Sequence, residues 1–186
     1  TLTAAGFPPE SIDTVLCTHL HVDHVGWNTR LVADKWVPTF ANARYVFGKT
    51  EYEYWRDHSI APDKVSVFND SVKPIVDAGR AELVASDHRL TDEISMIPTP
   101  GHSPGHMSLH IVSDGAAALL TGDVAHHPCQ MAHLDWASTA DFDPAQSAET
   151  RRALFSRFAD TPTLVIGGHF DGARLAREGD AFKFIT

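Results

Sequence analysis

The chain has 186 residues, of which 43% are hydrophobic and 21% are charged, a balance typical of one compact globular domain. Fifteen Lys and Arg residues stand against 24 Asp and Glu residues, so the net charge is −9. This acidity argues against a nucleic-acid partner, and no apolar run reaches the length of about 18 residues that a membrane span needs. We therefore expect a single domain over residues 1–186 that binds neither nucleic acid nor membrane.

The histidine and cysteine content limits the kinds of functional site that we expect in this chain. The twelve histidines are about twice the number that average usage would give, and surplus histidine is typical of metal or proton chemistry. The two cysteines, Cys17 and Cys129, are far apart and lack the C-x-x-C spacing, which excludes a zinc ribbon and a disulfide framework. We expect Cys17, in an apolar run, to pack in the core and Cys129 to play no ligand role.

The first half of the chain predicts a mixture of short helices and strands. Apolar periodicity and breaker residues indicate a helix end and turn over residues 4–12, a strand over 14–18, irregular structure over 27–40, a strand over 44–47, a helix over 49–56 and a helix within 62–79.

The second half has clearer boundaries. Asp114 and Gly115 form a strong turn signal between two apolar runs, and Asp143 is a plausible N-cap. The expected elements are strands over 81–85 and 94–99, a hairpin of 107–113 with 116–121, a helix over 144–159, a strand over 163–166 and a final strand over 181–185. No internal repeat interrupts this order, which favours an α/β layered domain with polar loops at the strand ends.

The segment from His19 to His24 is one half of a candidate metal site. It places His19, His21, Asp23 and His24 directly after an apolar run. In an extended segment, residues two apart point the same way, so His19 and His21 can bind one ion while Asp23 and His24 reach a neighbouring position.

Three further segments each carry a polar residue where an apolar strand ends. Residues 99–106 form a loop rich in proline and glycine with His102 and His106, and we expect His106 to support the site rather than bind an ion. Asp123 follows a strand, and His169 follows two glycines after another strand. An α/β fold gathers such residues from distant segments into one cleft.

The motifs HxHxDH, GHSPGH, TGD and GGH occur in this chain in the order found in metallo-β-lactamase superfamily hydrolases, which the chain resembles from about position 14 to 185. The resemblance implies an α/β fold of the four-layer αββα type. It also implies two metal positions, the first with His19, His21 and His102, the second with Asp23, His24 and His169, and Asp123 as the bridge between them.

Asp123 also indicates a branch of the superfamily. The carboxylate at that step resembles the lactonase, esterase and methyl parathion hydrolase-like branch more than the true β-lactamases. Quorum-quenching lactonases in the family often carry a tyrosine three residues later, whereas this chain has His126. That difference weakens an assignment to acyl-homoserine lactones in particular.

The resulting hypothesis is a dinuclear hydrolase in which a metal-bridging hydroxide cleaves an ester or lactone. Zinc is the default pair of divalent ions, and manganese, iron, cobalt or nickel also suit imidazole and carboxylate ligands. Asp23 or His126 would protonate the leaving group, and His127 would face the substrate or belong to the loop. The alternatives are hydrolysis of organophosphates or phosphodiesters and, from another class, a metal-binding redox module.

Superfamily members usually carry several strands ahead of HxHxDH, yet the motif begins here at position 19. We therefore expect a natural N-terminal portion of roughly 60–100 further residues on grounds of domain size. A homodimer stays open, and the cytoplasm is the default location.

Overall fold

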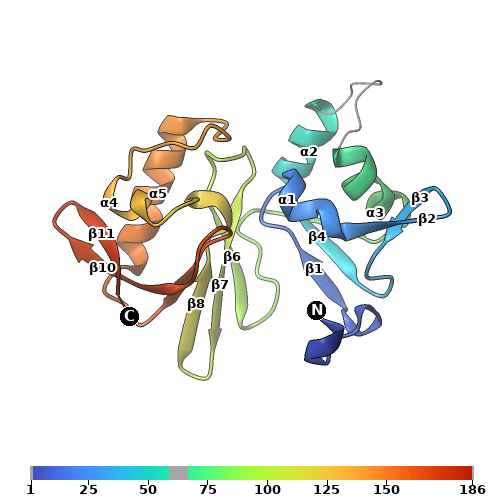
Figure 1. Cartoon of the computed structure of the whole chain (residues 1–186), viewed down its shortest axis with the longest axis horizontal. Helices are drawn as coiled ribbons and strands as arrows, with labels where there is room; N and C mark the ends of the chain where they lie inside the picture. The colour runs from blue at the N-terminus through green and yellow to red at the C-terminus, as the bar shows by residue number, and fades with distance from the viewer. Residues whose placement is uncertain (1, 59–66, 186) are drawn as a thin grey trace. The chain divides into compact units, whose positions relative to one another are not determined.

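The computed structural model describes residues 2–58 and 67–185. Contacts within the chain divide it into two compact units, Thr1–Ala85 and Ser86–Thr186, which are described separately below (Figure 1). The α/β class expected from the sequence is confirmed in both. The single domain expected over residues 1–186 stays a prediction.

The first unit is built around a small parallel sheet. Its three strands lie in the order β1-β4-β5, and a separate hairpin pairs β2 with β3. Parallel neighbours need crossover connections, and helices fill these connections here. The elements are β1 (Thr14–Leu16), α1 (Val22–Val25), β2 (Thr29–Val32), β3 (Lys35–Pro38), β4 (Arg44–Gly48), α2 (Lys49–His58), α3 (Lys73–Asp77) and β5 (Ala81–Val84), with short 3₁₀ turns at Thr3–Ala5, Pro9–Ser11 and Gly26–Asn28.

The central strand β4 anchors the core of this unit. Tyr45 and Phe47 are completely buried, as are Val72 and Ile75 from the helical segment that follows α2. Because the central strand of a parallel sheet is covered on both faces, nearly every residue of β4 is apolar, as its sequence indicates. The strand expected at 44–47 and the helix expected at 49–56 are therefore confirmed.

One expectation for the first unit needs correction. The segment 27–40 was expected to be irregular, but most of it forms the β2–β3 hairpin. Its turn places Ala33 and Asp34 at φ of 47° and 60°, although neither residue is glycine. The usual Asn-Gly or Asp-Gly signal of such a turn is missing, which is why no hairpin is expected here from local pattern.

The helix expected within 62–79 is confirmed for the described residues, but it is not one regular α-helix. Residues 62–66 lie outside the described part of the chain, and the rest forms a π-helical turn, Phe68–Val72, followed by α3. Pro74 accounts for the change, because it has no N–H to donate to the carbonyl of Asp70. That carbonyl accepts a hydrogen bond from the Thr29 hydroxyl instead, at 2.7 Å.

The second unit is a six-stranded sheet covered on one face by a long helix. The strand order is β11-β10-β9-β8-β7-β6, and only the β8–β9 pair is parallel among its five pairings (Figure 1). The elements are β6 (Ile94–Pro98), β7 (Met107–Ser113), β8 (Ala116–Leu120), α4 (Cys129–Ala132), α5 (Pro144–Phe158), β9 (Leu164–Ile166), β10 (Ala173–Glu178) and β11 (Ala181–Ile185), with a 3₁₀ turn at Gly122–Val124.

Local signals set most of these boundaries as predicted. Asp114 and Gly115 both have positive φ, 48° and 78°, and close the β7–β8 hairpin. The Asp143 side chain accepts a hydrogen bond of 3.0 Å from the backbone N–H of Gln146 and caps α5. Strand β10 was not expected, because Arg174, Arg177 and Glu178 interrupt its few apolar residues and leave no regular alternation.

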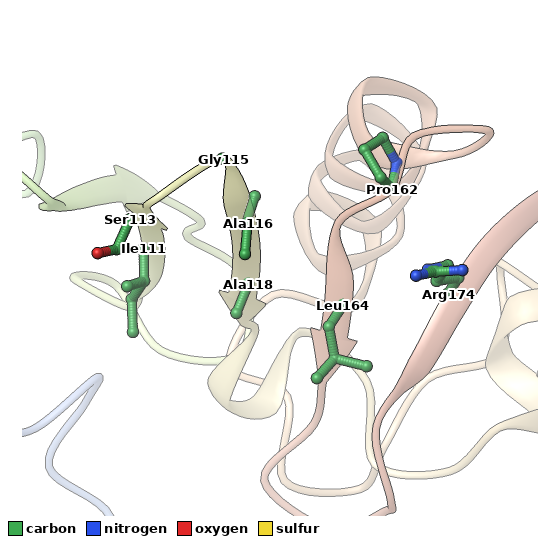
Figure 2. Close-up of a pocket in the computed structure, with 9 residues that line it drawn as sticks. Ile111, Ser113, Gly115, Ala116, Ala118, Pro162, Leu164 and Arg174 are labelled. Atoms are coloured by element: carbon green, nitrogen blue, oxygen red, sulfur yellow. The ribbon is translucent and has the colours of Figure 1, made fainter.

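The other face of the six-stranded sheet carries a shallow apolar hollow. Ala118 and Leu164 alternate with the core residues Leu119 and Val165, so they lie on the sheet face away from that core. Together with Ile111 they line a hollow of about 540 Å³ (Figure 2). The hollow lies at the start of β8, whereas Asp123 follows the end of the same strand. Among the described residues, no helix is long and apolar enough to cross a membrane.

The two thiols differ in their surroundings, which gives a first testable prediction. Cys17 is 5% exposed within the core of the first unit, and burial raises its pKa to about 12 despite a hydrogen bond with Asn28. Cys129 is only half-buried. Because the thiolate is the reactive form, Ellman's reagent at pH 8 should modify Cys129 in the native protein and Cys17 only after denaturation. The variant Cys129→Ser should remove the native reaction, and a persistent fast thiol in that variant would contradict the assignment.

Candidate metal centre

Four polar side chains of the second unit converge where its strands end. Asp123 follows β8, and His126 lies in the loop between Asp123 and α4. His169 follows β9. One oxygen of Asp123, Oδ2, lies 3.5 Å from His102 Nε2, 3.2 Å from His126 Nε2 and 3.1 Å from His169 Nε2. Three imidazoles therefore surround a single carboxylate oxygen, and the Asp123 side chain is only 3% exposed.

The loop before His102 is held tightly against α5. Gly101 has a φ of +132°, and a Cβ there would lie 2.4 Å from the backbone nitrogen of Ser147. Only glycine permits this close approach together with this backbone conformation. The carbonyls of Gly101 and His102 also accept hydrogen bonds from the N–H groups of Asp143 and Phe142. His102 is therefore presented from a rigid loop, as the proline and glycine content predicted.

A carboxylate orients the His102 ring. His102 Nδ1 lies 2.9 Å from Asp141 Oδ1, and the side chains of both residues are almost completely buried. Burial works to raise the pKa of Asp141, but hydrogen bonds from His102 and the Ser138 N–H, together with the charge of Arg151, hold that pKa below its ordinary value. An ionised carboxylate can only accept, so Nδ1 is the nitrogen that carries the ring proton and Nε2 is directed to Asp123.

His106 supports Asp123 from the backbone side. Its Nε2 accepts a hydrogen bond of 3.0 Å from the Asp123 N–H, and its Nδ1 lies 2.8 Å from the Thr99 hydroxyl. The ring is 1% exposed. These contacts agree with the supporting role expected for His106, which stays a prediction. His127, in contrast, is exposed and accepts a hydrogen bond from the Cys129 N–H at 3.1 Å, a role in the loop.

The first unit gathers its own group of imidazoles after β1. The His19 ring lies 4.7 Å from the His21 ring and 4.0 Å from the His24 ring, centroid to centroid. His24 lies in the short helix α1. Its Nε2 is 3.5 Å from Asp23 Oδ2. His19 is completely buried and Asp23 is exposed.

A buried glutamate fixes this imidazole group. Glu51 of α2 is 1% exposed, and its Oε1 accepts hydrogen bonds from the Leu20 N–H at 3.0 Å and from Trp55 Nε1 at 2.7 Å. Leu20 stands between the two histidines of the HxH pair, so this bond holds the backbone that carries both. The Trp55 ring also packs edge-to-face on the His21 ring, with 5.4 Å between the two ring centroids.

The predicted ligands are thus brought together within each unit. His19, His21, Asp23 and His24 form one group, and His102, Asp123 and His169 form another with His126 beside them. Their assembly into one dinuclear centre stays a prediction. Sequence reasoning missed Glu51 and Arg151, whose signal was a charged residue within an otherwise apolar helical stripe.

Comparison with known protein families identifies the superfamily of the chain. A sequence profile of the Metallo-beta-lactamase superfamily matches residues 2–169, which is most of the chain. The chain belongs to the metallo-β-lactamase superfamily. The resemblance carried by the four histidine and aspartate motifs is therefore confirmed.

Relatives within the superfamily include named lactonases. The N-acyl homoserine lactonase AiiA of Bacillus thuringiensis subsp. kurstaki is 25% identical over 169 residues, which cover 90% of this chain and 60% of that protein. The N-acyl homoserine lactonase AttM of Rhizobium radiobacter is 30% identical over 133 residues, covering 67% and 46%. The chain thus spans about 60% of the length of AiiA.

Solved structures share the fold. A hydrolase of the β-lactamase superfamily, AbOPH, matches with a TM-score of 0.86 at 24% identity, covering 99% of this chain and 67% of that one. The dizinc quorum-quenching lactonase AidC matches with a TM-score of 0.82 at 22% identity, covering 99% and 67%. The metallo-β-lactamase fold expected for the chain is confirmed by these matches.

Proposed function

We propose that the chain forms the catalytic part of a metal-dependent hydrolase that cleaves an ester or a lactone. In this proposal both units belong to one metallo-β-lactamase-type domain and contribute ligands to one dinuclear centre. The proposed ligands of the first ion are His19, His21 and His102, those of the second are Asp23, His24 and His169, and Asp123 is shared by both.

The arrangement around Asp123 Oδ2 carries the proposal. A neutral His102 keeps its proton on Nδ1, where Asp141 accepts it, so its Nε2 presents a lone pair to the Asp123 oxygen at 3.5 Å. Two electron-rich atoms that face one another at a buried position repel each other. A divalent cation between them would turn this repulsion into coordination, and imidazole with carboxylate is a donor set that such ions prefer.

The donor set fits zinc, and manganese, iron, cobalt or nickel would also suit it. Divalent ions bound there would polarise the substrate and lower the pKa of water toward neutrality. The chain's own residues would do the rest. Asp141 would keep the His102 ring oriented, His106 would hold the Asp123 backbone, and Asp23 or His126 would give a proton to the leaving group.

An ester or lactone substrate follows from the named relatives, AiiA and AttM, which are N-acyl homoserine lactonases. His126 sets this chain apart from the tyrosine expected at that step in such enzymes. Its Nε2 lies 3.2 Å from Asp123 Oδ2, and its ring stacks on His169 at 5.3 Å. His126 would therefore face the leaving group directly, and the lactone need not carry an acyl-homoserine portion.

Metal analysis combined with a substrate panel tests the proposal. The purified protein should hold about two divalent ions per chain and should hydrolyse p-nitrophenyl acetate and a γ-lactone with higher kcat/KM than paraoxon and bis-p-nitrophenyl phosphate. Removal of the ions with a chelator should abolish turnover, and added Zn²⁺ should restore it. Preference for paraoxon or the phosphodiester would favour phosphoester hydrolysis. Full metal occupancy without turnover on the whole panel would overturn the proposal in favour of a redox module.

A further inference from the structure

Arg151 is a buried charge in the middle of the apolar side of α5. It is 0% exposed and shares that side with Leu154, Phe155 and Phe158, which belong to the core of the second unit. An unpaired guanidinium in such a place would be very costly, so a buried arginine is retained only where its donors are used. The directions of these donors therefore indicate what Arg151 does.

The guanidinium reaches both sides of the loop that follows Asp123. Its donors extend to backbone carbonyls on one side and to the orienting carboxylate on the other. Nε donates to the Val124 carbonyl at 2.8 Å, Nη1 donates to the carbonyls of Leu134 and Trp136 at 2.6 and 2.9 Å, and Nη2 lies 3.4 Å from Ser147 Oγ and 3.9 Å from Asp141 Oδ2.

Groups that Arg151 contacts are linked to Asp123, His126 and His102 through the chain or through hydrogen bonds. Val124 directly follows Asp123 in the chain. The Trp136 carbonyl also accepts a hydrogen bond from Gln130 Nε2 at 2.7 Å, and Gln130 Oε1 accepts one from the His126 N–H at 2.7 Å. Asp141 bonds to His102 Nδ1 at 2.9 Å. One guanidinium is thus linked to the supports of all three residues: Asp123, His126 and His102.

We infer that Arg151 is a positioning residue for the metal centre, fixing through one side chain both the carboxylate that orients His102 and the loop that presents Asp123 and His126. The inference deepens the proposed function and rests on it for the identity of the bound group. A lysine could not replace it, because an ammonium group lacks the planar fork that donates in several fixed directions at once.

The first measurement uses metal-free protein, so that it does not depend on the proposed function. In ¹H–¹⁵N spectra of the histidine side chains, the wild-type His102 ring should show a protected Nδ1–H, assigned through its loss in His102→Gln. In Arg151→Met that signal should broaden or exchange at least about tenfold faster. The matched control is Phe155→Leu, on the same helix and in the same core, which should lower the melting temperature but leave the His102 signal unchanged.

The second measurement is metal affinity by competition with a chromogenic chelator. Arg151→Met should bind Zn²⁺ about 10–100-fold more weakly than wild type, the loss typical of groups that orient metal ligands, whereas Phe155→Leu should bind as wild type. Arg151→Lys should resemble Arg151→Met rather than rescue it. Equal effects in Arg151→Met and Phe155→Leu would reduce Arg151 to a core residue and overturn the inference.

A double-mutant cycle with Asp141→Asn tests the route through that carboxylate and remains usable if Arg151→Met fails to fold, with Arg151→Lys in its place. The double variant should lose little more His102 protection than either single variant, because both act on the same contact. Simple additivity would overturn the Asp141 route. If wild-type protein binds no metal, the proposed function fails, while the His102 signal in metal-free protein still decides the positioning role.

Discussion

Replacing Asp123 by asparagine is expected to reduce kcat/KM for the preferred ester or lactone by at least about 10³-fold, at the upper end of what loss of one charge-stabilising group costs an enzyme. The amide keeps the volume of the side chain but removes the negative charge around which His102, His126 and His169 gather. Without that charge the two proposed ions lose their shared ligand. Metal content should fall from about two ions per chain to about one or none.

The control for this variant is Asp114→Asn in the β7–β8 turn, at the other end of strand β8 from Asp123. Asp114 is exposed and has a φ of 48°, which asparagine adopts as readily as aspartate. This change should leave melting temperature, metal content and turnover unaltered. Full activity with two bound ions in Asp123→Asn would contradict a bridging role, whereas loss of activity in both variants would point to a general effect of charge.

The sequence predicts most of the strand ends that carry the candidate ligands. Apolar runs followed by polar residues predict that β8 ends shortly before Asp123 and that β9 ends shortly before His169. The structure confirms both strand ends. The reason is physical: a buried strand must be apolar, so the first polar residue after it marks its emergence from the core. His106 was also expected to support the site, and its ring accepts a hydrogen bond from the Asp123 N–H, although its role at a metal centre stays a prediction.

The supports of the site were harder to predict, because they act over long sequence separations. Glu51 bonds to Leu20, 31 residues earlier, and Arg151 bonds to Val124, 27 residues earlier. Helical periodicity places each charge within an apolar stripe but does not show which distant groups it contacts. Only the tertiary fold reveals that these charges point inward and satisfy backbone groups of the loops that carry the histidines.

Secondary structure was missed where local signals conflict with tertiary packing. The β2–β3 turn uses Ala33 and Asp34 in a backbone region that usually selects glycine or asparagine, so its sequence resembles an ordinary loop. Strand β10 mixes two alanines and Leu175 with arginine and glutamate, a weak strand signal that its pairing with β9 and β11 overrides. Both elements lie outside the four motifs, where the sequence carries weaker local signals.

The proposal that both units serve one centre predicts that a ligand from either unit controls metal binding. His21→Ala in the first unit and His169→Ala in the second should each weaken Zn²⁺ binding by at least about 10²-fold, more than loss of an orienting group costs. Each change removes one of a few strong donor atoms that the ion must replace with water. Turnover should fall with metal occupancy in both variants.

Matched controls are His58→Ala and His133→Ala, which remove exposed histidines of the first and second unit. Neither should alter metal affinity. Loading the wild-type protein with Co²⁺ adds a direct measurement, because a paramagnetic ion shifts the ring signals of the histidines that bind it. The signals of His21 and His102 should shift together at the same number of metal equivalents. Separate titration of the two histidines, or normal binding in His21→Ala, would mean that each unit holds its ions alone and that the shared centre does not exist.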